Sequence, residues 1–101
     1  TCEALWMGVP VLTLKGNRML FHSGECINSN LGMSDWIAKN NNDYISKALE
    51  FSSNIKELIK IRKNLRKTAL NSPLCDSENF GIQFSKMLWE MWNNFDKKNN
   101  F

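Results

Sequence analysis

The stretch VPVLTL, from Val9 to Leu14, decides the fold class of this 101-residue chain. Residues 11–14 form an unbroken apolar and β-branched run, which is typical of a strand buried on both faces of a parallel sheet. Such a strand needs neighbours to satisfy its backbone groups, and the sequence shows no second convincing strand. We therefore expect an α/β fold that is mostly helical with one clear strand, and we expect the missing strands upstream of Thr1.

Helical patterns surround this strand. The segment 1–7 is apolar and ends at Gly8, which favours the visible end of a helix. A helix is expected over 17–30, with Asn17 as its cap and Gly32 as its end. A short helix is expected from Ser34 through Trp36 and Ile37, and a longer one from a cap at Asp43. Two more helices are expected, one over 54–70 and one from Asp76 or Ser77 onward.

The last of these helices has the clearest periodicity in the chain. Its apolar positions recur at intervals of three and four residues, which predicts an amphipathic helix. They are Phe80, Phe84, Met87, Leu88, Met91, Trp92 and Phe95. We expect this stripe to pack against other parts of the protein, and to be partly exposed where those parts are missing. The polar tail from Asp96 is expected to fray.

The net charge of +3 comes from one segment. Residues 54–67 hold six basic side chains and one acidic side chain, so their local charge is +5 and the rest of the chain carries −2. On a helix that turns about 100° per residue, the four lysines of this segment share one face. This pattern favours the solvated face of an amphipathic helix. The alternative is a basic surface for nucleic acid or anionic lipid, although no aromatic side chains interleave with the lysines as base stacking requires.

The three cysteines argue against a disulfide framework or a zinc site. Cys2, Cys26 and Cys75 are odd in number, far apart and without a C-x-x-C pair. We interpret them as small buried hydrophobes in a reducing compartment, which predicts a cytoplasmic location. No apolar run reaches the roughly 18–20 residues that span a bilayer, and no signal peptide is visible.

Several motifs together resemble one known family. They are CEALWMGVPVLTL from Cys2 to Leu14, then Gly16, Leu31-Gly32, Trp36-Ile37-Ala38, Ser72-Pro73-Leu74 and Met91-Trp92. In this order they resemble the C-terminal end of the O-linked N-acetylglucosamine transferase / SPINDLY family, and the resemblance covers essentially the whole chain. Members are GT-B glycosyltransferases, usually with tetratricopeptide repeats ahead of the catalytic region. The resemblance implies that residues 1–71 are the C-terminal part of a Rossmann-like domain that binds the nucleotide sugar. Residues 72–101 would form a C-terminal helix that packs back on the catalytic region.

The resemblance also implies roles for four residues. Glu3 matches the family's acidic ribose-binding position, and a carboxylate offers two acceptor oxygens to the two ribose hydroxyls. Thr1 matches the last position of a stretch at the diphosphate, while Asn17 and Arg18 follow the strand and are possible donor-loop contacts. The simpler interpretation of Glu3 is that it complements a helix dipole. The family's catalytic groups lie upstream, so we expect no catalytic residue here, and we interpret the single histidine, His22, as structural.

The implied function is part of an enzyme that transfers a sugar, most simply N-acetylglucosamine, from UDP to protein Ser or Thr hydroxyls. Related members transfer fucose or glucose, and the acceptor protein would be chosen by upstream repeats. No metal or other cofactor is expected, since no cluster of carboxylates or histidines is present. Neither nucleic acid nor membrane is an expected partner, and the isolated chain is expected to be inactive. The alternative is a non-enzymatic basic helical module that binds nucleic acid or a protein partner.

Two arginines stand apart from the lysine face. Arg62 and Arg66 fall in the apolar sector of the basic helix, together with Ile55, Ile59 and Ala69. Arg62 matches a basic position of the family, whereas Arg66 does not match consistently. We expect the stem of Arg62 to be buried and its guanidinium to be paired with a carboxylate or with helix carbonyls. The alternative is that both side chains snorkel to water.

Overall fold

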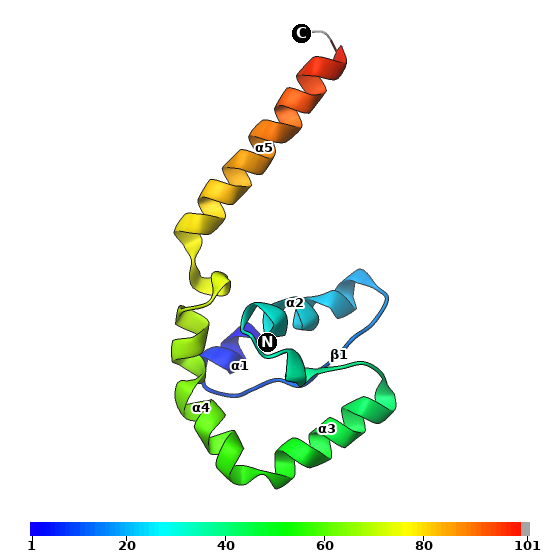
Figure 1. Cartoon of the computed structure of the whole chain (residues 1–101), viewed down its shortest axis with the longest axis vertical. Helices are drawn as coiled ribbons and strands as arrows, with labels where there is room; N and C mark the ends of the chain where they lie inside the picture. Colours follow the sequence, from blue (N-terminus) through cyan, green and yellow to red (C-terminus); the bar gives the residue numbers. More distant parts are fainter. Residues whose placement is uncertain (100–101) are drawn as a thin grey trace.

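A computed structural model describes residues 1–99, and it shows a helical body around two short strands (Figure 1). The elements are α1 (Cys2–Trp6), β1 (Thr13–Leu14), η1 (Met19–Phe21), α2 (His22–Asn30), η2 (Ser34–Trp36), β2 (Ile37–Ala38), α3 (Asn41–Ser53), α4 (Ile55–Leu70), η3 (Pro73–Cys75) and α5 (Ser77–Asn99), where η marks a 3-10 turn. The mostly helical character expected from the sequence is confirmed.

The prediction of one strand is wrong, because β2 pairs with β1. The two strands are parallel, with Thr13 opposite Ile37 and Leu14 opposite Ala38. A helix was expected from Ser34, but it ends after the single turn η2, and the backbone then extends alongside β1. The pairing satisfies backbone groups that a lone strand would leave open. β1 is also shorter than the expected run 11–14, and both of its residues are only half-buried.

A buried amide on α2 braces the two strands. The Nδ2 of Asn28 donates to the carbonyl of Val11 at 2.9 Å and to the carbonyl of Trp36 at 3.2 Å. These carbonyls lie shortly before β1 and directly before β2, so one side chain connects both strands to α2. Gly24 lets α2 approach β1 closely, since a Cβ there would lie 2.3 Å from the Thr13 Oγ1.

The core lies where α1, α2 and α4 meet. Its buried members are Leu5, Leu31, Leu65 and Ala69, with Val11, Ile27 and Met33 packed against them. On the other side of the body, the Trp36 ring stacks on Phe51 of α3 at 4.3 Å between centroids. Of the apolar residues expected along α4, Leu65 and Ala69 are buried, whereas Ile55 and Ile59 are exposed.

Two expected helix starts differ from the structure. α2 begins at His22 after the turn η1, so Asn17 does not cap it. In α3 the cap is Asn40, whose side chain accepts the Asp43 amide, while the Asp43 carboxylate accepts the Lys39 amide. Asn and Asp are both good caps, and the residue with extended backbone takes the role; Asn40 has φ −153° and ψ 177°.

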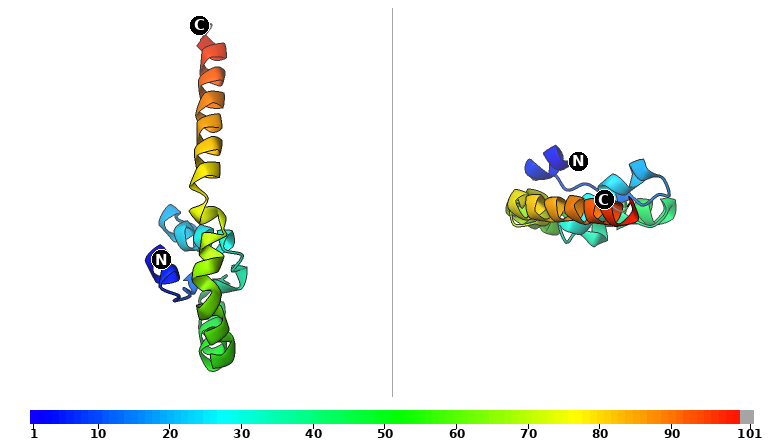
Figure 2. Two further views of the ribbon diagram at one scale, coloured as in Figure 1. Left: turned by 90° about the vertical axis from the view of Figure 1, so that its left-hand side faces the viewer. Right: turned by 90° about the horizontal axis from the view of Figure 1, so that it is seen from above.

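The helix α5 leaves the body along the long axis of the molecule (Figures 1 and 2). Its start adjoins η3, and its seven predicted stripe residues are between 46% and 67% exposed. This exposure agrees with the expectation that the stripe is partly exposed. The helix continues to Asn99, so the expected fraying from Asp96 is wrong for residues 96–99, and residues 100–101 lie outside the described part. Within residues 1–99, no helix is both long and apolar enough to cross a membrane.

Gly8 ends α1 with a backbone that other residues adopt poorly. Its φ is +77°, and a Cβ would lie 3.2 Å from the carbonyl oxygen of Arg62. We expect Gly8→Ala to destabilise the protein by about 1–2 kcal/mol, because the left-handed region is unfavourable for a residue with a Cβ. Thermal unfolding of the variant measures the loss.

Gly81→Ala is the matched control. Gly81 lies inside α5 with nothing within 4 Å of its added Cβ. This change is expected to stabilise the helix by about 0.5–1 kcal/mol, because alanine is the better helix former. A Gly8→Ala protein as stable as the parent would contradict the strain argument.

Candidate functional site

The short helix α1 carries the acidic residue on which the site prediction depends. α1 has five residues, with Thr1 at the N-cap position and Glu3 in the first turn. Leu5, on the inner side of the helix, is 2% exposed in the core. Burial of Leu5 therefore directs Glu3 away from the core.

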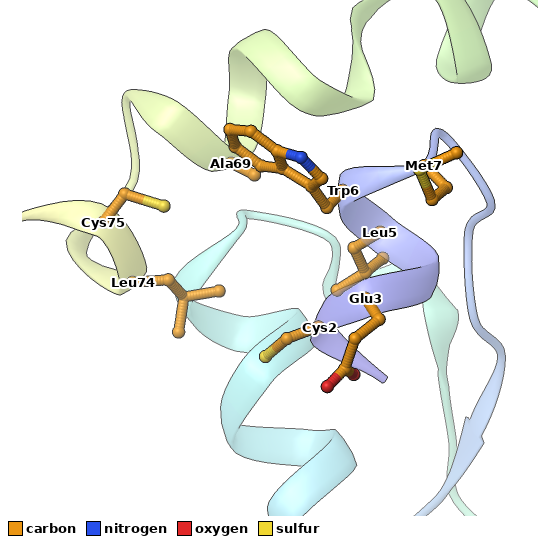
Figure 3. Close-up of a pocket in the computed structure, with 8 residues that line it drawn as sticks. All are labelled: Cys2, Glu3, Leu5, Trp6, Met7, Ala69, Leu74 and Cys75. Atoms are coloured by element: carbon orange, nitrogen blue, oxygen red, sulfur yellow. The ribbon is translucent and has the colours of Figure 1, made fainter.

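Glu3 is an exposed, ionised carboxylate. Its side chain is 94% exposed. Its own backbone N–H lowers the pKa of the Glu3 carboxyl below its usual value. Figure 3 shows the carboxylate at the N-terminal end of α1, away from Trp6 and Ala69. The charge is thus available to a ligand that approaches this end of the helix.

A largely apolar cavity of about 440 Å³ opens beside Glu3. Its walls come from α1, the end of α4 and η3 (Figure 3). Two cysteines, Cys2 and Cys75, line it, and both are exposed, as is Cys26 on α2. The prediction that the cysteines are buried is therefore wrong. Cys2 and Cys75 face the open cavity, and Cys26 faces solvent.

Thr1 also borders a second hollow, of about 570 Å³, next to β1. The hollow brings Thr1 together with Leu14 at the end of the strand, and with the hydroxyl residues Ser23 of α2 and Tyr44 of α3. Ligands in open α/β sheets bind outside the carboxyl ends of strands, which is where this hollow lies. Sequence reasoning missed Ser23 and Tyr44, because no local motif marks residues that only the strand pairing brings together.

The predicted donor-loop residues line neither hollow. Asn17 and Arg18 are exposed in the bend between β1 and η1. The Arg18 carbonyl accepts the Phe21 amide at 2.9 Å and so starts the turn η1. Glu3 lines the cavity between α1 and η3, whereas Thr1 borders the hollow beside β1, so the structure does not gather the four predicted residues around one hollow.

A small charge cluster holds the loop after β1 against α2. The Glu25 carboxylate lies 3.2 Å from Lys15 Nζ and 3.3 Å from His22 Nδ1. Hydrogen bonds from Lys15 first and His22 second lower the pKa of Glu25 below its usual value. His22 therefore has a local partner in the fold.

The expected burial of Arg62 is wrong, and Arg66 makes the contact instead. The Arg62 side chain is exposed, and only its backbone carbonyl faces α1, at Gly8. One turn later, Arg66 reaches the Trp6 carbonyl at 2.7 Å. The reason is that Gly8, which has no side chain, lies opposite Arg62, whereas the Trp6 ring lies opposite Arg66.

Comparison with known proteins identifies the class. The model of glycosyl transferase family 41 matches residues 1–84. The chain is 34% identical over 95 residues to the probable UDP-N-acetylglucosamine–peptide N-acetylglucosaminyltransferase SPINDLY of Hordeum vulgare, which covers 94% of the chain and 10% of that protein. The SPINDLY protein of Arabidopsis thaliana is 30% identical over 97 residues, covering 96% and 11%. The probable transferase SEC of Arabidopsis thaliana is 29% identical over 93 residues, covering 90% and 9%.

The matched family model and relatives are glycosyltransferases by name. More narrowly, the chain belongs to glycosyl transferase family 41, which confirms the resemblance seen in its motifs. It spans about a tenth of the length of the curated relatives it matches.

Proposed function

We propose that this chain helps to hold the nucleotide-sugar donor of a protein O-glycosyltransferase. The full-length protein would transfer a sugar, most simply N-acetylglucosamine, from UDP to Ser or Thr hydroxyls of an acceptor protein. The observation that carries the proposal is the match over residues 1–84 to a glycosyltransferase family. The SPINDLY and SEC relatives, whose names specify UDP-N-acetylglucosamine and peptide, support the choice of donor and acceptor.

Within this proposal Glu3 binds the donor ribose. Its carboxylate is charged and exposed, and no side chain within residues 1–99 donates a hydrogen bond to it. Two acceptor oxygens suit two adjacent hydroxyls, and hydrogen bonds to a charged acceptor are the stronger kind. Thr1, which borders the hollow at the end of β1, would contact the diphosphate through its hydroxyl or its N–H. Asn17 and Arg18, exposed in the loop that follows β1, are the proposed donor-loop contacts.

The contribution of this chain to catalysis is positioning. A bound donor that is held in one orientation meets the acceptor hydroxyl at a lower entropic cost. Residues 1–71 would complete the sugar-nucleotide domain, and 72–101 would pack back on the catalytic region. The exposed apolar stripe of α5 supports the second role. The absence of a metal and the cytoplasmic location stay predictions.

The basic-module alternative receives less support. The lysines of α4 are exposed, as a solvated face requires. The same helix buries Leu65 and Ala69 against α1, so it is an integral part of the fold that carries Glu3.

The test is a transfer assay on the full-length protein. It is incubated with labelled UDP-N-acetylglucosamine and candidate acceptor proteins, and labelled Ser or Thr is sought by mass spectrometry. A parallel reaction with UDP-glucose identifies the sugar, and transfer from GDP-fucose alone would contradict the UDP donor. Absence of transfer from every donor, with a folded protein, would contradict the proposal.

A sharper prediction concerns Glu3 in the full-length protein. Glu3→Ala is expected to weaken UDP binding by about 1.5–3 kcal/mol, because ribose hydroxyls lose a charged acceptor. Calorimetry with UDP measures the dissociation constant. Glu50→Ala, which removes another exposed carboxylate on α3, is the control and should leave binding unchanged. An unchanged Kd for Glu3→Ala would contradict the ribose role and leave Glu3 only the role of complementing the helix dipole.

A further inference from the structure

The helix α1 depends on the rest of the fold for its orientation. Its one deeply buried side chain, Leu5, is 2% exposed among Leu31, Leu65 and Ala69. Burial of Leu5 sets which face of α1 points to the core, but apolar contacts restrict smaller rotations of the helix only weakly, because they are non-directional.

Arg66 of α4 supplies the directional contacts. Its Nε donates to the Trp6 carbonyl at 2.7 Å, and its guanidinium lies 4.9 Å from the centroid of the Trp6 ring. One terminal nitrogen lies 3.8 Å from the Met7 sulfur. The carbonyls in the last turn of a helix have no partner within the helix, and a cation is favoured there. A planar guanidinium that stacks and donates at once restricts rotation more than a lysine would.

One turn of α1 links the residues that Arg66 contacts to Glu3. The Met7 amide donates to the Glu3 carbonyl at 3.0 Å, so the residues that Arg66 holds are bonded to the backbone of Glu3. Trp6 and Glu3 are three residues apart and lie on neighbouring positions of the helix surface. A rotation of the Trp6 end would therefore carry the Glu3 carboxylate with it.

We propose that Arg66 is a positioning residue for the nucleotide, which holds α1 in the rotation that presents Glu3 to the donor. The proposal rests on the proposed ribose role of Glu3. Arg66 itself does not touch the nucleotide. Its effect on binding passes through α1, so it disappears when Glu3 is absent.

The test measures UDP binding to four variants of the full-length protein. Arg66→Ala should raise the Kd for UDP about five- to twentyfold, since a hydrogen bond from a charged donor and a cation–π contact are lost. Arg66→Lys should restore little of the affinity, because an ammonium lacks the planar fork. Lys67→Ala, which removes the adjacent exposed charge, should change the Kd less than about twofold.

The decisive variant combines Arg66→Ala with Glu3→Ala. In the Glu3→Ala background, the further loss on removing Arg66 should be less than about twofold, because coupled residues are not additive. A merely structural Arg66 would lower the unfolding temperature and give the same fold-change in Kd in both backgrounds, which would overturn the proposal. Arg66→Gln, which keeps most of the stem, replaces Arg66→Ala if the latter does not fold.

The two proposals fail in different ways. If Glu3→Ala weakens binding as expected and Arg66→Ala does not, only the role of Arg66 is overturned. If Glu3→Ala leaves the Kd unchanged, the ribose role of Glu3 fails, and the route from Arg66 through Glu3 fails with it. Hydrogen exchange of the 2–7 segment then reports separately whether Arg66 holds α1, since Arg66→Ala should speed exchange there.

Discussion

Leu5→Ala is expected to destabilise the region around α1 by about 2–5 kcal/mol, the range for truncating a fully buried leucine. Leu5 is 2% exposed and joins α1 to Leu31, Leu65 and Ala69 of the core. The substitution removes apolar contacts and leaves a cavity that α1 alone cannot fill. Because α1 joins the core through Leu5, detachment of α1 should also abolish the contribution of Glu3 to UDP binding.

Thermal unfolding, and hydrogen exchange in residues 2–7, measure the effect of Leu5→Ala in the full-length protein. Leu20→Ala is the matched control, because it makes the same chemical change at a side chain that is 89% exposed. It should alter stability by no more than about 0.5 kcal/mol. Equal unfolding temperatures for the two variants would show that Leu5 does not anchor α1.

Asn28→Ala is expected to cost about 2–4 kcal/mol, because the carbonyls of Val11 and Trp36 lose their common donor. The Asn28 side chain is fully buried, and its two carbonyl partners determine which amide atom faces them. Its buried Oδ1 has no partner among residues 1–99, so removal of that atom offsets part of the lost stability. The segments before β1 and β2 should separate, which hydrogen exchange at residues 11–14 and 36–38 would detect.

Two further asparagine variants test this brace. Asn64→Ala is the control, since Asn64 lies inside α4, is exposed, and bonds only the Lys60 carbonyl of its own helix. It should have little effect on stability. Asn28→Asp keeps the shape but points a carboxylate oxygen at two carbonyl oxygens, so it should destabilise more than Asn28→Ala. An Asn28→Asp protein as stable as the parent would exclude donation by Asn28 as the brace.

Local features of the fold could be predicted from the sequence because near neighbours decide them. Gly8 and Gly32 end helices at φ +77° and +72°, since only glycine adopts this backbone without strain. Asp76, one of the two residues expected to cap the last helix, accepts the Asn79 amide in the first turn of α5. The motifs from Cys2 to Leu14 likewise led to the family, because a family signature is a property of the chain itself.

Contacts between distant segments could not be predicted in this way. Ile37 and Ala38 are not marked as a strand by any local pattern, and they extend because β1 lies beside them and Asn28 holds the preceding carbonyl. Helical angles alone placed Arg62 and Arg66 in the same sector of α4. The residues that face them, Gly8 at Arg62 and Trp6 at Arg66, decided which arginine contacts α1.

The candidate site also combines features that the sequence determines with features that only the tertiary structure determines. The sequence alone determined the residue types, a carboxylate at Glu3 and a hydroxyl at Thr1. Only the tertiary structure decided that Thr1, Ser23 and Tyr44 border one hollow at the end of β1, and that Arg66 donates to the Trp6 carbonyl of the helix that carries Glu3. The physical reason is that caps and turns depend on interactions within a few residues, whereas a parallel strand pair and an inter-helix clamp join segments separated by dozens of residues.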